Sequence, residues 1–274
     1  MKVSDLLLKK LGDIQDQKVA VLLSGGSGSA SVLFALIELG KKIHAYTFNL
    51  EGHESTDLKK AIELTNKYDI EFTSIPLPTD INTIKKDCVY LINDVGCQLK
   101  TDVEICFAFK NSLPLIQEKV LVTGLGDDNY FGLSKKAQIY YKNSIDLMDK
   151  NRIKMFEKLN VQHKLFEKMA ESYGIKIVSP YQTEEMLNIF IGTSYEEINK
   201  PKQKQWILDT FPKYFSQEKC YHADLQKGDS KIADNFLQLL NSDWNYKGYK
   251  RTDGIYNSIG RGELPLESES GLYD

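Results

Sequence analysis

A short apolar run that ends in a glycine- and serine-rich turn and is followed by a second apolar run most constrains this fold. Residues 18–23 are rich in β-branched side chains, which predicts a buried parallel strand. Residues 30–39 are apolar on most faces and stop before Gly40, which predicts a helix. The turn between them consists of Ser24, Gly25, Gly26, Ser27, Gly28 and Ser29.

Such a turn suits an anion. Glycines allow the backbone to approach a phosphate closely, and the first amides of a helix point toward it. In an open α/β sheet, ligands bind beyond the carboxyl ends of the strands, which is where this turn lies. The turn fits neither G-x-x-x-x-G-K-[ST] nor G-x-G-x-x-G with its acidic partner, so a plain flexible turn is the alternative.

The rest of the first half alternates between strand and helix patterns. We expect strands at 43–48, 71–75 and 120–123, and helices at 57–68, 81–92 and 103–117. This alternation predicts an α/β fold with a doubly wound, mostly parallel sheet.

From Lys136 onward the spacing is mostly helical, with helices expected at 149–173, 184–191 and 202–210. We therefore expect a nucleotide-binding core at 1–135, a helical substrate-side region of the same fold at 136–242 and an irregular tail at 243–274.

Composition excludes several classes of protein. The 274 residues are 42% hydrophobic with a net charge of −3, which gives no overall attraction to nucleic acid or an anionic membrane. No apolar run approaches the ~18–20 residues of a membrane span, and no signal peptide is evident, so we expect a cytoplasmic protein. The four cysteines form no C-x-x-C pair and are expected to be reduced thiols, and the four histidines to be structural or on the surface.

The turn at 24–29 resembles the S-G-G-x-D-S loop of the ATP pyrophosphatases, the PP-loop family with an adenine nucleotide alpha hydrolase-like fold. That resemblance implies binding of ATP and cleavage between its α and β phosphates to adenylate a substrate. Gly28 stands where the family has an aspartate that helps to hold Mg²⁺. The sequence departs from the family at a residue needed for catalysis more than for nucleotide binding.

A second segment, residues 122–132, resembles the S-G-E-G-x-D-E-x-F-G segment of asparagine synthetase and its relatives. Six residues fit this pattern, whereas Leu125 and Asn129 replace its glutamates; the six are Thr123, Gly124, Gly126, Asp128, Phe131 and Gly132. Asp127 and Asp128 follow a predicted strand and are candidate Mg²⁺ ligands, with Asp128 also a candidate catalytic residue. The alternative is an acidic pair that caps the next helix.

The resemblance continues more weakly through the helical half. Gly174, Pro180 and Tyr181 fit a third family segment. Residues 226–228 resemble the family's last substrate-facing loop, and Lys227 is the first choice for the catalytic lysine of that loop, with Lys219 the second. By the same resemblance, the adenine of ATP should lie beside Leu22, Leu23 and Phe48, with Thr123 and Gly124 closing over the ribose side. Core packing would equally explain the apolar residues.

These resemblances imply an ATP- and Mg²⁺-dependent ligase that activates a carboxylate as an acyl-adenylate. No glutaminase domain is evident, so the nitrogen would come from ammonia, a substrate amine or a partner protein. A degenerate ATP- or AMP-binding sensor is the first alternative. A nucleic-acid-modifying ATP pyrophosphatase is the second and less favoured; residues 244–251 interleave aromatic and cationic side chains as a base-stacking surface does.

Overall fold

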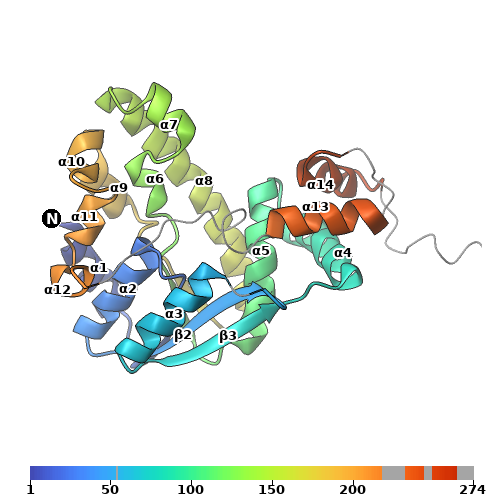
Figure 1. The fold of residues 1–274 in the computed structure, drawn as a ribbon, viewed down its shortest axis with the longest axis horizontal. Coiled ribbons are helices and arrows are strands. Elements are labelled where there is room, and N and C mark those ends of the chain that lie inside the picture. Colours follow the sequence, from blue (N-terminus) through green and yellow to red (C-terminus); the bar gives the residue numbers. More distant parts are fainter. Residues whose placement is uncertain (54, 218–231, 244–248, 264–274) are drawn as a thin grey trace, which may run out of the picture.

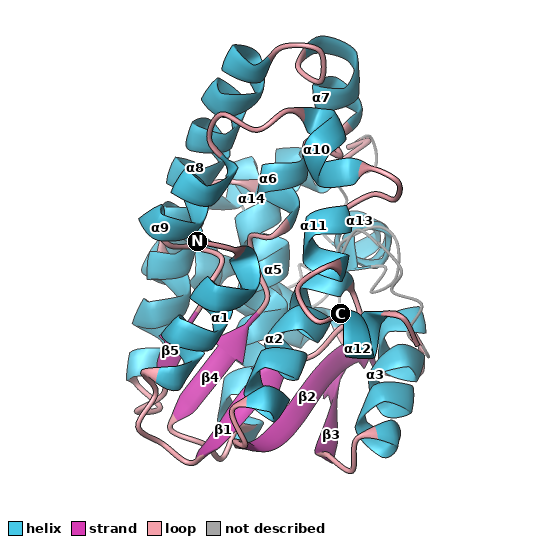
Figure 2. Ribbon diagram, turned by 90° about the vertical axis from the view of Figure 1, so that its left-hand side faces the viewer, coloured by secondary structure: helices cyan, strands magenta, loops and turns pink. Residues whose placement is uncertain are grey.

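The computed structural model describes residues 1–53, 55–217, 232–243 and 249–263 (Figure 1). These residues contain a five-stranded parallel sheet. The strand order is β3-β2-β1-β4-β5, and every neighbouring pair runs in parallel. The strands are β1 (Lys18–Leu22), β2 (Lys42–Leu50), β3 (Glu71–Leu77), β4 (Val120–Thr123) and β5 (Lys176–Val178). Their arrowheads point toward the end of the molecule that carries α6 and α7 (Figure 2).

The sheet is buried on both faces because its inner strands carry apolar side chains in both directions. Val19 and Val21 of β1 pack into one core, and Ala20 packs into the other. The register places Val21 opposite Ala45 of β2 and Val122 of β4. The predicted doubly wound parallel sheet is confirmed.

Helices cover both faces of this sheet. The core that contains Val21 also takes apolar residues from α1 (Val3–Gly12), α2 (Ser27–Glu38), α3 (Thr56–Lys67), α6 (Asp128–Phe131), α9 (Glu184–Phe190), α10 (Tyr195–Asn199), α11 (Gln205–Leu208) and α12 (Pro212–Phe215). The opposite core takes them from α4 (Ile81–Tyr90), α5 (Lys100–Ser112), α8 (Ile145–Glu171), α13 (Ile232–Asp243) and α14 (Thr252–Gly260). A short helix, α7 (Lys135–Tyr140), precedes α8.

Two predicted helices continue into tighter or wider turns. The helix expected at 81–92 is α4, which passes into a π-helical turn at Leu91–Val95 and ends at Gly96 in the left-handed conformation. The helix expected at 103–117 is α5, which begins at Lys100 and is followed by a 3₁₀ turn at Leu113–Leu115.

Three expectations for the second half need correction. Strand β5 lies within the half expected to be helical, and its three residues are too few to give a clear period-2 pattern. The helix expected at 202–210 is limited to α11, because Lys204 adopts a left-handed backbone conformation with φ of 57°.

The third correction concerns the segment from Asp243, which was expected to be irregular. It contains α14, whose Ile255, Tyr256 and Ile259 are buried against the core that also takes residues from α4 and α5. Residues 244–248 of the aromatic and cationic segment lie outside the described residues. Tyr249 packs against this same core and its hydroxyl lies 3.0 Å from that of Ser258.

The structure also bears on the expectations for membrane spans and thiols. Among the described residues, no helix has the length and apolar character that crossing a bilayer requires. Cys88, Cys97 and Cys106 are free thiols and are buried, in agreement with the expectation of reduced cysteines, whereas Cys220 lies outside the described residues.

Candidate functional site

The site lies where the order of the strands reverses. From β1 the chain moves outward through β2 and β3, and then returns to place β4 on the other side of β1. A crevice opens at the carboxyl ends of the strands at such a point, and ligands bind there in open α/β sheets. The segments that leave β1 and β4 are the two loops singled out in the sequence.

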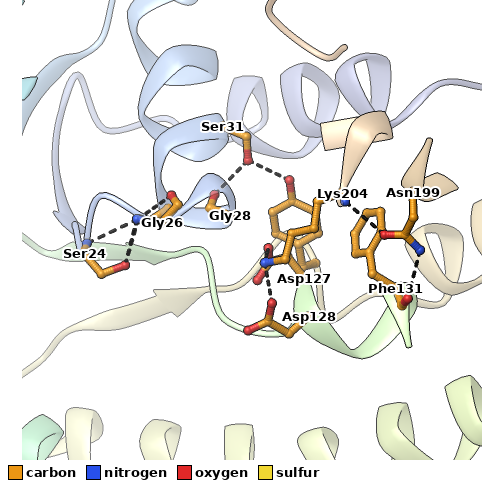
Figure 3. Close-up of polar contacts among 11 residues, drawn as sticks. Ser24, Gly26, Gly28, Ser31, Asp127, Asp128, Phe131, Asn199 and Lys204 are labelled. Atoms are coloured by element: carbon orange, nitrogen blue, oxygen red, sulfur yellow. Dashed lines mark hydrogen bonds and ion pairs between the residues drawn. The ribbon is translucent and has the colours of Figure 1, made fainter. Parts of the chain in front are cut away.

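The first loop is held in shape by its own serines (Figure 3). The Ser29 hydroxyl accepts a hydrogen bond from the Ser24 amide at 3.2 Å and donates one to the Gly26 carbonyl at 3.1 Å. The Gly26 amide donates to the Ser24 hydroxyl at 3.3 Å. These bonds fix the entry into α2, so the loop is preorganised.

Helix α2 presents its amino end at this loop. The first bond of the helix runs from the Ala30 amide to the Gly26 carbonyl. The amides of Ser27, Gly28 and Ser29 precede that bond and belong to the helix turn that lacks internal partners. They form the end of the helix dipole that attracts anions.

The two loops touch through Gly124. A Cβ atom at this position would lie 2.5 Å from the Ser29 amide nitrogen and 2.7 Å from the Gly28 carbonyl carbon. Real Cβ atoms do not approach backbone this closely, so only glycine allows the turn after β4 to lie against the first loop. The expected role of Gly124 beside the ribose stays a prediction, although the residue does line the pocket.

The second loop brings two carboxylates to the same place. Asp127 is buried and Asp128 is half exposed, and the ammonium of Lys204 forms ion pairs with both (Figure 3). The Lys204 Nζ lies 2.6 Å from the Oδ2 of Asp127. The pair with Asp128 is close as well. A buried lysine is therefore paired with both carboxylates, and all three side chains belong to residues that line one pocket.

Asn199 positions this lysine. Its side-chain oxygen accepts a hydrogen bond from the Lys204 amide at 2.9 Å, and its side-chain nitrogen donates to the Phe131 carbonyl at 3.0 Å (Figure 3). The same amide side chain thus joins the end of α6 to the turn before α11. Lys204 was not predicted as a site residue, because the spacing of residues 202–210 predicts a helix.

The ionisation of this pair follows from burial and charge. Burial raises the pKa of Asp127, because the positive charge of Lys204 only partly offsets the lost hydration. Burial alone would lower the pKa of Lys204, but the charges of Asp127 and Asp128 outweigh it and raise this pKa. Lys204 is therefore a cation at neutral pH.

Asp127 also explains the glycine at position 28. A Cβ atom on Gly28 would lie 2.6 Å from Oδ1 and 2.7 Å from Oδ2 of Asp127. The carboxylate of the second loop thus takes the space beside the first loop that any side chain at position 28 would need.

The pocket between these loops has a volume of about 280 Å³. One wall is polar and consists of the two loops, the acidic pair and Lys204. A second wall is apolar and consists of Leu22, Phe48, Ile105, Phe109, Leu159 and Phe166, together with Leu125 of the second loop. An anionic group against the first wall and a flat apolar ring against the second would both be accommodated.

Most predicted site residues meet in this pocket. They are Leu23, Ser24, Gly26, Ser27, Gly28, Ser29, Phe48, Thr123, Gly124, Asp127 and Asp128. Gly25 is not part of the lining; its φ is +74°, and a Cβ there would lie 2.6 Å from the Cβ of Lys60. The predicted lysines Lys227 and Lys219 lie outside the described residues.

The residues present fit Mg²⁺. Within the described ranges, no group of three or more His, Cys, Asp or Glu side chains is arranged to hold a metal ion by itself. Mg²⁺ is usually bound by one or two carboxylates together with substrate phosphates, and Asp127 and Asp128 supply the carboxylates beside the phosphate loop. Both would have to exchange Lys204 for the metal.

The fold is a doubly wound α/β fold: a parallel sheet, helices on both faces, and a glycine loop at the switch between β1 and β4. Residues 18–94 match the family model described as Queuosine biosynthesis protein QueC. This match runs from the start of β1 into the π-helical turn after α4 and supports a PP-loop between β1 and α2. The finer resemblance to asparagine synthetase stays a prediction.

Curated relatives agree with that match. Over 55 residues, the chain is 38% identical to the 7-cyano-7-deazaguanine synthases of Rickettsia bellii (strain OSU 85-389) and Rickettsia felis (strain ATCC VR-1525 / URRWXCal2). The aligned segment is 20% of this chain and 24% and 25% of those proteins. The chain thus spans about a quarter of the length of the curated relatives it matches.

Solved structures with a similar chain path are more distant. The U34-tRNA thiolase NcsA from Methanococcus maripaludis aligns with 94% of this chain and 76% of its own, at 15% identity and a TM-score of 0.40. An NH3-dependent NAD synthetase from Campylobacter jejuni aligns with 73% of this chain and 94% of its own, at 16% identity and a TM-score of 0.32.

Proposed function

We propose that this protein is an ATP-dependent enzyme that activates a carboxylate as an acyl-adenylate and releases pyrophosphate, with Mg²⁺ as its metal. The supporting observation is one pocket that combines a preorganised glycine loop, two carboxylates and a lysine with apolar lining residues. The match to the QueC family model supports ATP use by this pocket.

Each part of the pocket has a role in this proposal. The amides of Ser27, Gly28 and Ser29 hold phosphate oxygens, and the apolar wall holds the adenine. Lys204, in place of the predicted Lys227, neutralises charge on the departing pyrophosphate. Mg²⁺ bound at Asp127 and Asp128 would supply further neutralisation of the phosphates. Charge neutralisation and positioning are the main requirements of transfer at phosphorus.

The nitrogen acceptor belongs to the proposal as well. An acyl-adenylate is open to attack by ammonia, by an amine of the same substrate or by nitrogen from a partner protein. The relatives' name specifies a nitrile, and a nitrile carbon has the oxidation level of a carboxyl carbon. A 7-deazaguanine that carries a carboxyl group is therefore one acid to test, beside simple aliphatic and amino acids.

Exchange of labelled pyrophosphate into ATP tests this proposal. The chain is incubated with ATP, Mg²⁺, labelled pyrophosphate and one acid at a time, because exchange reports reversible adenylate formation without knowledge of the acceptor. We expect exchange with at least one acid and none without acid. Exchange with none of a broad panel, under conditions in which ATP binds, would contradict the proposed activity.

A second candidate function is a nucleotide-binding protein without turnover. It is favoured by the glycine at position 28 and by Lys204, which forms ion pairs with both carboxylates in this structure. Loop amides alone can hold a nucleotide without a metal ligand. Tight ATP or AMP binding with no pyrophosphate exchange would favour this second candidate.

A further inference from the structure

We propose that Asp127 and Lys204 together replace the loop carboxylate that is missing at Gly28, and that Lys204 acts as a built-in counter-cation that moves from the carboxylates to the nucleotide phosphates when metal and nucleotide bind. This inference rests on the proposed nucleotide site and specifies how that site is charged. It concerns positioning residues of this chain.

Asp127 fills the space beside Gly28. The space that a side chain at position 28 would enter already contains the Asp127 carboxylate, with oxygens 2.6 Å and 2.7 Å from the place of a Cβ. The acidic group therefore stands beside the phosphate loop but is contributed by the turn after β4. Position 28 is glycine because the carboxylate comes from the opposite loop.

Asp127 and Lys204 form a buried pair of opposite charges. Asp127 is buried, and a buried carboxylate requires a partner of opposite charge. Lys204 is buried as well, and its ammonium contacts both Asp127 and Asp128. Without ligand, the lysine satisfies the pair and occupies the position where a cation between two carboxylates is most stable.

Lys204 also lies in the candidate nucleotide pocket. The Lys204 side chain lines the same pocket as the loop amides of Ser27 and Ser29. A long, flexible side chain can change its partner while its backbone stays anchored by Asn199. With phosphates and Mg²⁺ bound, Asp127 and Asp128 would hold the metal and Lys204 would contact the phosphates. The carboxylates would thus have a cationic partner in both states.

A reciprocal exchange of side chains tests the steric part. The probe is the non-cleavable analogue α,β-methylene-ATP with Mg²⁺, titrated by calorimetry against Gly28→Asp, Asp127→Gly and the double variant. Each single variant should bind at least about tenfold more weakly, through a clash in the first and a lost carboxylate in the second. The double variant should return to within about threefold of the original affinity, because the two changes are not additive.

A titration with Mg²⁺ alone tests the counter-cation. Because Lys204 competes with the metal for Asp127 and Asp128, Lys204→Met should bind Mg²⁺ at least about tenfold more tightly than the original chain. Lys202→Met is the matched control: this lysine is exposed, and its removal should leave Mg²⁺ affinity unchanged. Thermal unfolding of each variant verifies that it is folded.

The outcomes separate this inference from the proposed function. If Gly28→Asp binds the analogue as tightly as the original chain, or if the double variant loses as much as both single variants together, Asp127 does not replace the loop carboxylate. Unchanged Mg²⁺ affinity in folded Lys204→Met overturns the counter-cation. If Lys204→Met does not fold, the reciprocal exchange still decides whether Asp127 replaces the loop carboxylate. Failure of the original chain to bind α,β-methylene-ATP would instead contradict the nucleotide site itself.

Discussion

Single glycines set the distance between the two loops of this site. At position 124, the backbone of the first loop leaves no room for even one methyl group. Side chains can move aside at modest cost, but two packed backbone segments cannot. The separation of the loops, and with it the width of the pocket, therefore depends on this residue.

Replacing Gly124 with alanine should lower the free energy of unfolding by about 1–3 kcal/mol, because the added Cβ would meet the Ser29 amide nitrogen. Denaturant unfolding followed by circular dichroism measures this loss. Gly12→Ala is the control, since a Cβ there meets only the Leu39 side chain at 3.7 Å. Equal stability of the two variants would mean that the loops separate freely.

A second residue-scale feature surrounds the buried Glu118, just before the amino end of β4. The buried Glu118 carboxylate lies 3.0 Å from His44 Nδ1, accepts a hydrogen bond from the Tyr46 hydroxyl at 2.9 Å, and pairs with Lys18 at 3.0 Å. Burial alone would raise the pKa of Glu118, but these partners outweigh it and the pKa is lowered. The network joins β1 and β2 to the segment before β4.

Glu118→Gln should cost about 1–3 kcal/mol of unfolding free energy at neutral pH, because a charged acceptor is lost from a buried network. Since the folded pKa lies below the ordinary value of 4.5, the carboxylate stabilises the fold above that pH and ceases to do so as pH falls through the folded pKa. The difference between original chain and variant should therefore be full above about pH 5 and shrink below pH 4.5. A difference that grows on acidification would contradict this assignment.

Part of the site could be predicted from the sequence alone. The phosphate loop was predictable because its strand, turn and helix are consecutive, so local patterns suffice. Asp127 and Asp128 were found through their neighbouring glycines. Lys204 was not, because it reaches Asp127 across 77 positions through a left-handed turn that no local pattern announces.

At the scale of elements, α8 supports the second loop through one buried arginine. Arg152 donates hydrogen bonds to the carbonyls of Tyr130 at 3.0 Å, Phe190 at 2.7 Å and Thr193 at 2.9 Å. It also pairs with Asp149 at 2.7 Å. Tyr130 belongs to α6, so the helix that follows the acidic pair is fastened to α8.

Arg152→Met should lower the free energy of unfolding by about 3–5 kcal/mol, because Asp149 and three carbonyls lose a buried partner. Lys154→Met on the exposed side of α8 is the control and should change stability by less than about 0.5 kcal/mol. Urea unfolding compares the two. Similar, small losses in both variants would mean that α6 is held by its apolar contacts alone.

Elements differed in how well the sequence announced them. β1, β2, β3 and β4 were predicted because each is a run of four or more residues that contains β-branched or aromatic side chains. β5 has only three residues, and its place is determined by pairing with β4. α14 was missed because few of its residues are aliphatic, and its Tyr256 and Ile259 find a core that only the tertiary fold provides.

At the scale of the whole molecule, the strand order unites these features. Reversal between β1 and β4 brings together two loops that are about a hundred residues apart in the chain. The helical second half then returns to deliver Lys204 to the same crevice. The chain as a whole therefore builds one site, with a polar loop wall and an apolar wall.

Gly26→Val tests the central claim that this site binds ATP. Gly26 has φ of −69° and ψ of 159°, which valine also adopts, so the variant should fold while its side chain blocks approach to the loop. The measurement is a calorimetric titration of both proteins with α,β-methylene-ATP and Mg²⁺, with thermal unfolding as the control. We expect saturable one-site binding by the original chain and at least about tenfold weaker binding by the equally stable variant. Equal affinities, or no binding by the original chain, would contradict it.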